Sequence, residues 1–215
     1  MAQKASPYAI RVGYNQDWNS YHFAKNKEEE IKWLKKDKSI RDYLYSLFPD
    51  IDRLKIECTK YNIFIYIYIQ EVSLLLGENN SKLEEVMKGI YKIIDNDKVS
   101  VKVNLIEVKN IYTHAQSIAN LIAGQLKKRT RSRQVIRNLL NILAREREVK
   151  GAKIEISGRL DESDIAQTKK IVQGKMPLST IDSNISVGET NVTMSYGSIG
   201  IKVLIYKGKI WQKKK

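Results

Sequence analysis

The sequence predicts an α+β protein built from two compact regions, and three observations support this class. Apolar side chains recur at three- and four-residue spacing in several stretches, as they do on one face of a helix. Other short stretches alternate apolar and polar residues, as half-buried strands do. The chain has 215 residues, of which 42% are apolar. This is enough for two domains with modest cores, and it argues against wholesale disorder.

Composition also restricts the class of partner. Lysine and arginine number 38 against 24 acidic residues, which gives a formal net charge of +14. A domain with that excess repels itself unless it lies against a polyanion, and nucleic acid is the commonest one, with acidic membrane second. No apolar run approaches the length of a membrane span, and the N-terminus has no hydrophobic signal core. The lone Cys58 excludes an internal disulfide and is expected to be a small apolar strand residue.

The N-terminal half contains a basic arm and one domain. Residues 1–17 are expected to be an extended arm that carries Lys4 and Arg11. A helix from Lys27 is expected to end at Pro49, which cannot continue it. Two strands, a short apolar segment, a second helix and a third strand follow, at residues 53–58, 63–69, 73–76, 81–94 and 101–105. Because both faces of the strand at 63–69 are apolar, it is expected to be central in its sheet.

This order of elements is that of a type II KH domain, here residues 18–108. Such domains hold a G-x-x-G loop between two helices, where glycine lets the backbone approach nucleic acid closely. The equivalent loop is Gly77, Glu78, Asn79 and Asn80, which lacks the second glycine and carries an acid. We therefore favour a scaffold role for this domain, while direct RNA clamping by the loop stays open.

The second half, residues 109–210, predicts an α+β domain with a mixed or antiparallel sheet, followed by a basic tail at 211–215. Two helices are expected around 118–125 and 135–143, and then a strand at 152–157. After a turn at 158–160 the pattern favours a short helix around Ile165. Three strands are expected between 178 and 207, with turns at Gly188 and Gly197.

A basic segment between these two helices is the strongest positional signal. Arg129, Arg133 and Arg137 recur every four residues and so lie on one helical face, where their guanidinium groups can bind successive phosphates. A solvated surface without a ligand is the alternative, but no acid occurs from residue 127 to 143. The residues expected to bind RNA are Lys4, Arg11, Lys127, Lys128, Arg129, Arg131, Arg133, Arg137, Arg159 and Lys175.

Catalysis has little support in the sequence. His22 and His114 are far apart, and no Walker loop, paired metal-binding histidines or C-x-x-C motif occurs. The acids at 161, 162 and 164 are expected to be caps and solubilising charges. We therefore predict a protein that is not an enzyme and has no cofactor and no metal.

Several spaced motifs resemble one family throughout the chain. They are Ile10-Arg11-Val12-Gly13, Ser157-Gly158-Arg159-Leu160, Gly174-Lys175-Met176-Pro177-Leu178 and Tyr196-Gly197-Ser198-Ile199-Gly200. In one register they resemble the bacterial-type third protein of the small ribosomal subunit, the S-three family. The resemblance implies a basic arm, a type II KH domain and an α+β C-terminal domain, bound to ribosomal RNA in the head of the subunit.

The resemblance also implies a place beside the fourth and fifth small-subunit proteins, where messenger RNA enters and is unwound. The family's basic helix positions fall on Arg133, Gln134 and Arg137, and Gln134 replaces a basic residue. The degenerate loop at 77–80 and the biased composition favour a plastid-type organelle over a bacterial cytoplasm. Two rival hypotheses are a free KH-type RNA-binding regulator outside the ribosome and an enzyme acting on nucleic acid.

Overall fold

The computed structural model describes residues 5–59, 62–70, 72, 81–94 and 99–210. They group into two compact units. Residues 18–109 form the N-terminal unit, and the C-terminal unit joins the residues up to 17 to those from 110 onward. Each unit contains a four-stranded sheet and helices, which confirms the α+β class.

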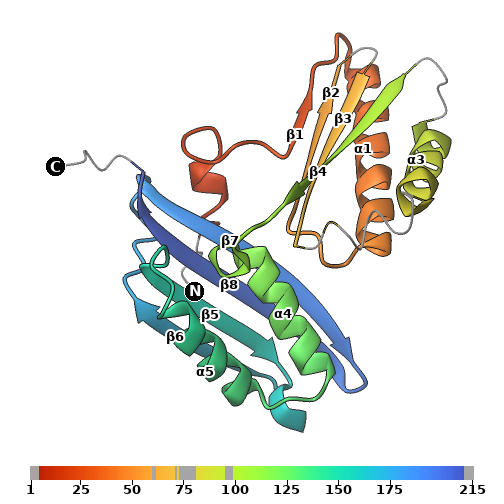
Figure 1. The fold of residues 1–215 in the computed structure, drawn as a ribbon. Coiled ribbons are helices and arrows are strands. Elements are labelled where there is room, and N and C mark those ends of the chain that lie inside the picture. The colour runs from red at the N-terminus through yellow and green to blue at the C-terminus, as the bar shows by residue number, and fades with distance from the viewer. Residues whose placement is uncertain (1–4, 60–61, 71, 73–80, 95–98, 211–215) are drawn as a thin grey trace. The chain divides into compact units, whose positions relative to one another are not determined.

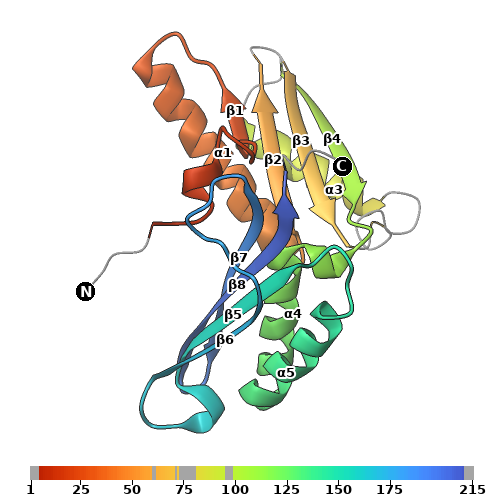
Figure 2. The same cartoon turned by 90° about the vertical axis from the view of Figure 1, so that its left-hand side faces the viewer.

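The N-terminal unit is a sheet of order β1-β2-β3-β4 with helices on one face (Figure 2). Its elements are β1 (Ser20–His22), α1 (Lys27–Leu47), β2 (Arg53–Cys58), β3 (Asn62–Ile69), α3 (Ser81–Ile94) and β4 (Ser100–Glu107). Strand β3 pairs antiparallel with β2 and parallel with β4, so the prediction that it is central is confirmed.

Isoleucine and aromatic residues alternate along β3, and this alternation explains why the helices pack on one face of the sheet. Its isoleucines are buried and pack in one cluster with side chains of α1 and α3, while its aromatic side chains are partly exposed on the other face. The buried isoleucines are Ile63, Ile65, Ile67 and Ile69. Helix α1 ends two residues before Pro49, as expected. The predicted segment at 73–76 and the predicted KH loop at 77–80 lie outside the described residues.

The C-terminal unit is an antiparallel sheet of order β6-β5-β8-β7, with α4 and α5 on one face (Figure 1). Its helices are α4 (Ala115–Lys127) and α5 (Ser132–Leu143). Its strands are β5 (Gly151–Gly158), β6 (Gln167–Gly174), β7 (Ser183–Met194) and β8 (Gly197–Lys209). Three short 3₁₀ turns complete it: η1 (Ala9–Arg11), η3 (Ile111–Thr113) and η4 (Leu160–Glu162).

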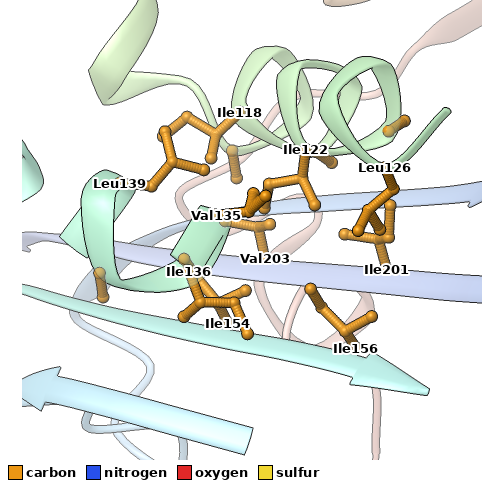
Figure 3. Packing of buried hydrophobic residues seen from close by; sticks show 14 of the residues in the cluster. Ile118, Ile122, Leu126, Val135, Ile136, Leu139, Ile154, Ile156, Ile201 and Val203 are labelled. Carbon is orange, nitrogen blue, oxygen red and sulfur yellow. The ribbon is translucent and has the colours of Figure 1, made fainter. Parts of the chain in front are cut away.

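Aliphatic side chains from both helices and the two central strands form the core of this unit (Figure 3). They include Ile118, Ile122 and Leu126 of α4, Val135, Ile136 and Leu139 of α5, Ile154 and Ile156 of β5, and Ile201 and Val203 of β8. Burying one such side chain contributes roughly 1.5–3 kcal/mol. The inner face of α5 is thereby fixed against the sheet, and its outer face is left to solvent.

Two expectations about this sheet are wrong. The segment 178–207 contains two long strands rather than three, and Gly188 lies inside β7 instead of in a turn. A Cβ at Gly188 would overlap the backbone of Ala115, so the glycine lets the start of α4 approach the strand closely. No helix surrounds Ile165; the 3₁₀ turn η4 precedes it and the edge strand β6 follows.

Candidate nucleic-acid interface

The turn between α4 and α5 carries the basic segment, and its backbone is closely defined. The amide of Thr130 donates to the carbonyl of Gln125 at 3.2 Å, and the amide of Arg129 donates to that of Leu126 at 2.8 Å. This pair of hydrogen bonds commonly terminates a helix, and the residue that adopts the left-handed conformation there is usually glycine. Here Arg129 has φ of 59°, a left-handed conformation that costs a residue with a Cβ roughly 1–2 kcal/mol. A strained backbone thus carries an exposed cation.

The N-terminus of helix α5 is hydrogen-bonded to the carboxylate of Asp161, a residue of η4. The backbone amide and the hydroxyl of Ser132 donate to the two oxygens of Asp161, at 2.8 and 2.9 Å, and Lys169 contacts the same carboxylate at 2.6 Å. Burial alone would raise the pKa of Asp161, but the hydrogen bonds from Lys169 and Ser132 hold it below its usual value. The ionised carboxylate therefore stabilises the N-terminus of α5 and connects it to η4 and β6.

The side chains on the outer surface of this helical pair are cationic and accessible. Lys127, Lys128, Arg129, Arg131, Arg133 and Arg137 are all exposed. Within the described part of the chain, none of the six has an acidic partner. The structure therefore brings six of the ten predicted residues onto one surface, which we call the α5 surface. A hollow of about 310 Å³ adjoins it, and its lining includes Arg129, Arg131 and Asp161.

Two cations beyond the end of α5 were not predicted. Arg145 and Arg147 follow the helix directly and are exposed. Glu146 and Glu148 alternate with them in the sequence, which made this stretch look neutral.

Arg11 is in a different environment, and the prediction that it binds RNA is corrected. Its side chain is 0% exposed. Its guanidinium donates to the backbone carbonyls of Pro7 at 2.7 Å, Leu178 at 2.9 Å, Thr180 at 2.7 Å and Ser183 at 2.9 Å. Burial lowers the pKa of Arg11, yet a guanidinium stays charged near neutral pH. Residues 5–17 of the expected arm therefore pack on the C-terminal unit as an integral part of it.

Three other predicted residues are separate from the α5 surface. Lys4 lies outside the described residues. Arg159 is half-buried and donates to the carbonyls of Ser163 at 3.0 Å and of Tyr196 at 3.1 Å, and Tyr196 also lines the hollow beside Arg129 and Arg131. Lys175 is exposed directly after β6. Gly151 pairs with Gly174 and Gly158 with Gln167, so Lys175 and Arg159 follow opposite ends of a strand pairing that is about 23 Å long.

The remaining site classes have no geometric support in the described residues. No group of three or more histidine, cysteine or acidic side chains in the described ranges could hold a metal ion. Among these residues, no helix combines the length and the apolar character needed to cross a bilayer. Burial, and secondarily the charge of Asp37, raises the pKa of the Cys58 thiol to about 11. Such a thiol is a poor nucleophile near neutral pH.

Comparison with known proteins gives consistent matches. Residues 122–205 match the family described as ribosomal protein S3, C-terminal domain. The chain is 36% identical to the small ribosomal subunit protein uS3 of Spiroplasma citri, over 99% of this chain and 84% of that protein. It is 32% identical to the same protein of Mycoplasma capricolum subsp. capricolum, over 100% and 92%, and of Clostridium tetani, over 100% and 96%.

These matches confirm the resemblance seen in the motifs and correct one expectation. The relatives are bacterial, so the preference for a plastid-type organelle has no support. A ribosomal protein is favoured over both a free RNA-binding regulator and an enzyme acting on nucleic acid. Together, the fold, the cationic α5 surface and similarity along nearly the whole chain show that the chain belongs to the bacterial-type uS3 family of the small ribosomal subunit, whose members are structural proteins and not enzymes.

Proposed function

We propose that the chain binds ribosomal RNA in the head of the small subunit and helps to line the channel through which messenger RNA enters. In this proposal α5 presents charge to the passing messenger, and other cations hold the folded ribosomal RNA. The fourth and fifth small-subunit proteins are the expected neighbours. Binding is electrostatic, because each cation that reaches a phosphate releases condensed counterions.

The carrying observation is the exposed, unpaired outer surface of α5. Arg133 and Arg137 lie one turn apart on a helix whose other face is fixed by the core, so their spacing is rigid. Guanidinium groups held in this way can contact successive phosphates without first becoming ordered. The carboxylate that fixes the start of α5, Asp161, is occupied by Ser132 and Lys169 and does not neutralise Arg133.

We further propose that the N-terminal unit is a type II KH domain. Its order α1-β2-β3-α3-β4, with β3 antiparallel to β2 and parallel to β4, supports this assignment. A scaffold role is favoured over RNA clamping, because Glu78 and Asn80 depart from the loop motif. The remaining basic residues, including Lys4, would contribute to ribosomal RNA binding.

The test is replacement of both Arg133 and Arg137 by alanine in assembled subunits. Loss of two phosphate contacts should reduce the slope of log K against log salt for messenger binding by about 1.4–1.8. Translation through a stable hairpin should slow, while an unstructured message is translated as before. Asn138→Ala with Asn141→Ala is the matched control, because both side chains are exposed on the same helix and uncharged. Unchanged passage through the hairpin would contradict the channel role.

A further inference from the structure

A second cationic site lies at the end of the C-terminal sheet that bears Lys175. It is an open hollow of about 660 Å³, lined by Lys150, Lys175, Met176, Pro177, Tyr206 and Lys209. Only Lys175 was predicted from the sequence, because the other two lysines are distant from it along the chain. The hollow belongs wholly to the C-terminal unit, and none of its lining residues belongs to the α5 surface.

The backbone that carries these lysines is held rigidly by strand pairing. The amide of Lys150 donates to the carbonyl of Tyr206 at 2.8 Å, and the amide of Lys175 donates to the carbonyl of Lys150 at 3.3 Å. A Cβ at Gly151 would overlap the carbonyl of Lys175, so only glycine permits this approach of the two strand ends. The three cationic positions therefore converge through the fold rather than through flexible loops.

The side chain of Lys150 reaches strand β8. Its Nζ lies 2.8 Å from the position that a Cβ of Gly208, the residue before Lys209, would occupy. On the other side, Arg11 donates to the carbonyls of Pro177 at 3.4 Å and Leu178 at 2.9 Å. The buried arginine therefore holds the segment that follows Lys175 and forms one wall of the hollow.

The charge of the hollow is uncompensated within the described residues. No aspartate or glutamate lines it, and no ion pair involves Lys150, Lys175 or Lys209 in the described ranges. All three side chains are exposed, so water can reach them and an anion can enter. Three ammonium groups around one hollow repel one another until an anion neutralises them.

We propose that this hollow binds backbone phosphate of the folded ribosomal RNA, as a second contact independent of the α5 surface. The lysines would contact phosphate oxygens, and Tyr206, Met176 and Pro177 would contact an adjoining sugar or base. An RNA chain fits better than a free nucleotide, because the hollow is open to solvent and has no glycine-rich phosphate loop. The inference rests on the proposed ribosomal RNA binding and adds a defined place for it.

The test compares two triple variants of the full-length chain that lose equal charge. Lys150→Gln with Lys175→Gln and Lys209→Gln removes the hollow's cations. Lys32→Gln with Lys35→Gln and Lys38→Gln removes three exposed lysines of α1. Binding to small-subunit ribosomal RNA is measured from 50 to 300 mM salt, about the range over which such contacts are screened. The slope of log K against log salt should fall by about 2 in the hollow variant and by less than about 1 in the α1 variant.

Each other outcome has a defined meaning. If the hollow variant keeps the wild-type slope, or both variants lose the same amount, no phosphate is bound there specifically and the inference is overturned. If inorganic phosphate binds the hollow while RNA affinity is unchanged in the variant, the site takes a free anion and the inference is again overturned. Failure of the unmodified chain to bind ribosomal RNA would instead contradict the proposed function itself.

Discussion

Arg11 and the arginines of the α5 surface use the same side chain in opposite ways. Arg11 is inaccessible to solvent, and the backbone carbonyls of Pro7 and of three residues between 178 and 183 accept its hydrogen bonds. Arg133 and Arg137 are exposed, and the described residues offer them no acidic partner. Both kinds belong to the same unit and contribute equally to the net charge. Basic composition therefore measures attraction to nucleic acid only after the buried, internally bonded cations are set aside.

The largest expected effect is a loss of stability when the buried arginine, Arg11, is replaced. Replacing Arg11 by methionine should lower the free energy of unfolding by roughly 3 kcal/mol, because several carbonyls lose a charged donor in a buried site. The matched Arg133→Met should change it by no more than about 0.5 kcal/mol, as exposed substitutions usually do. Urea denaturation measures both, and equal stability of the two variants would remove the distinction between these arginines.

A smaller effect is expected where the α5 surface is attached to the fold. Asp161→Asn should lower the free energy of unfolding by about 1 kcal/mol at neutral pH, because the helix N-terminus and Lys169 lose a negative partner. The pKa of Asp161 is lowered in the folded state, so its stabilisation is present above the unfolded pKa. It should vanish as the pH falls through the folded pKa.

Denaturation of this variant as a function of pH checks both parts of the prediction. Asp164→Asn is the control, since Asp164 is fully exposed and meets Arg159 only at 3.5 Å. A stability difference between wild type and Asp161→Asn that persists below the lowered pKa would mean that the carboxylate charge is not its cause.

Arg129 should show a conflict between stability and binding. Arg129→Gly should raise the free energy of unfolding by about 0.5 kcal/mol, because relief of left-handed strain outweighs the added chain entropy of glycine. The same change should reduce the salt slope of RNA binding by about 0.7–0.9, the contribution of one phosphate contact. Higher stability with undiminished binding would show that Arg129 takes no part in the interface.

The smallest effect is expected at Gln134. Arginine at this exposed position adds a positive charge next to Arg133, and it should increase the salt slope by about 0.7–0.9 without changing stability. Gln134→Asn, which adds no charge, is the control in the same binding titration. No gain from the arginine would indicate that messenger does not pass this side of α5.

The sequence predicted the elements whose side chains repeat strongly. The isoleucines of β3 gave both its strand character and its central position, and the apolar stripe of α5 placed Arg133 and Arg137 outside. Strand β6 was missed because it lies at the edge of the sheet and nearly all of its side chains are exposed. Since neither face of the strand is buried, its sequence does not need to alternate apolar and polar residues. At Gly188 the local pattern suggested a turn, while the constraint comes from α4 across the sheet.

Tertiary contacts limited the prediction of the site in the same way. Nothing local to Arg11 shows that carbonyls from residues 177–183 surround it, nor that Lys150 and Lys209 meet Lys175. A cluster that is contiguous in sequence, such as residues 127–137, can be recognised from charge alone. A cluster assembled from strand ends requires the register of the sheet.

The most direct test of this account is the reactivity of individual arginines in the free chain and in the intact small subunit. An arginine-selective dicarbonyl reagent, followed by mass spectrometry, should modify Arg129, Arg131, Arg133 and Arg137 in the free chain and leave Arg11 unmodified. In the subunit with messenger RNA bound, the four exposed arginines should be protected, and they should regain reactivity after RNA digestion, while Arg11 stays unreactive throughout. Equal reactivity of the four in the free chain and the subunit would contradict the account.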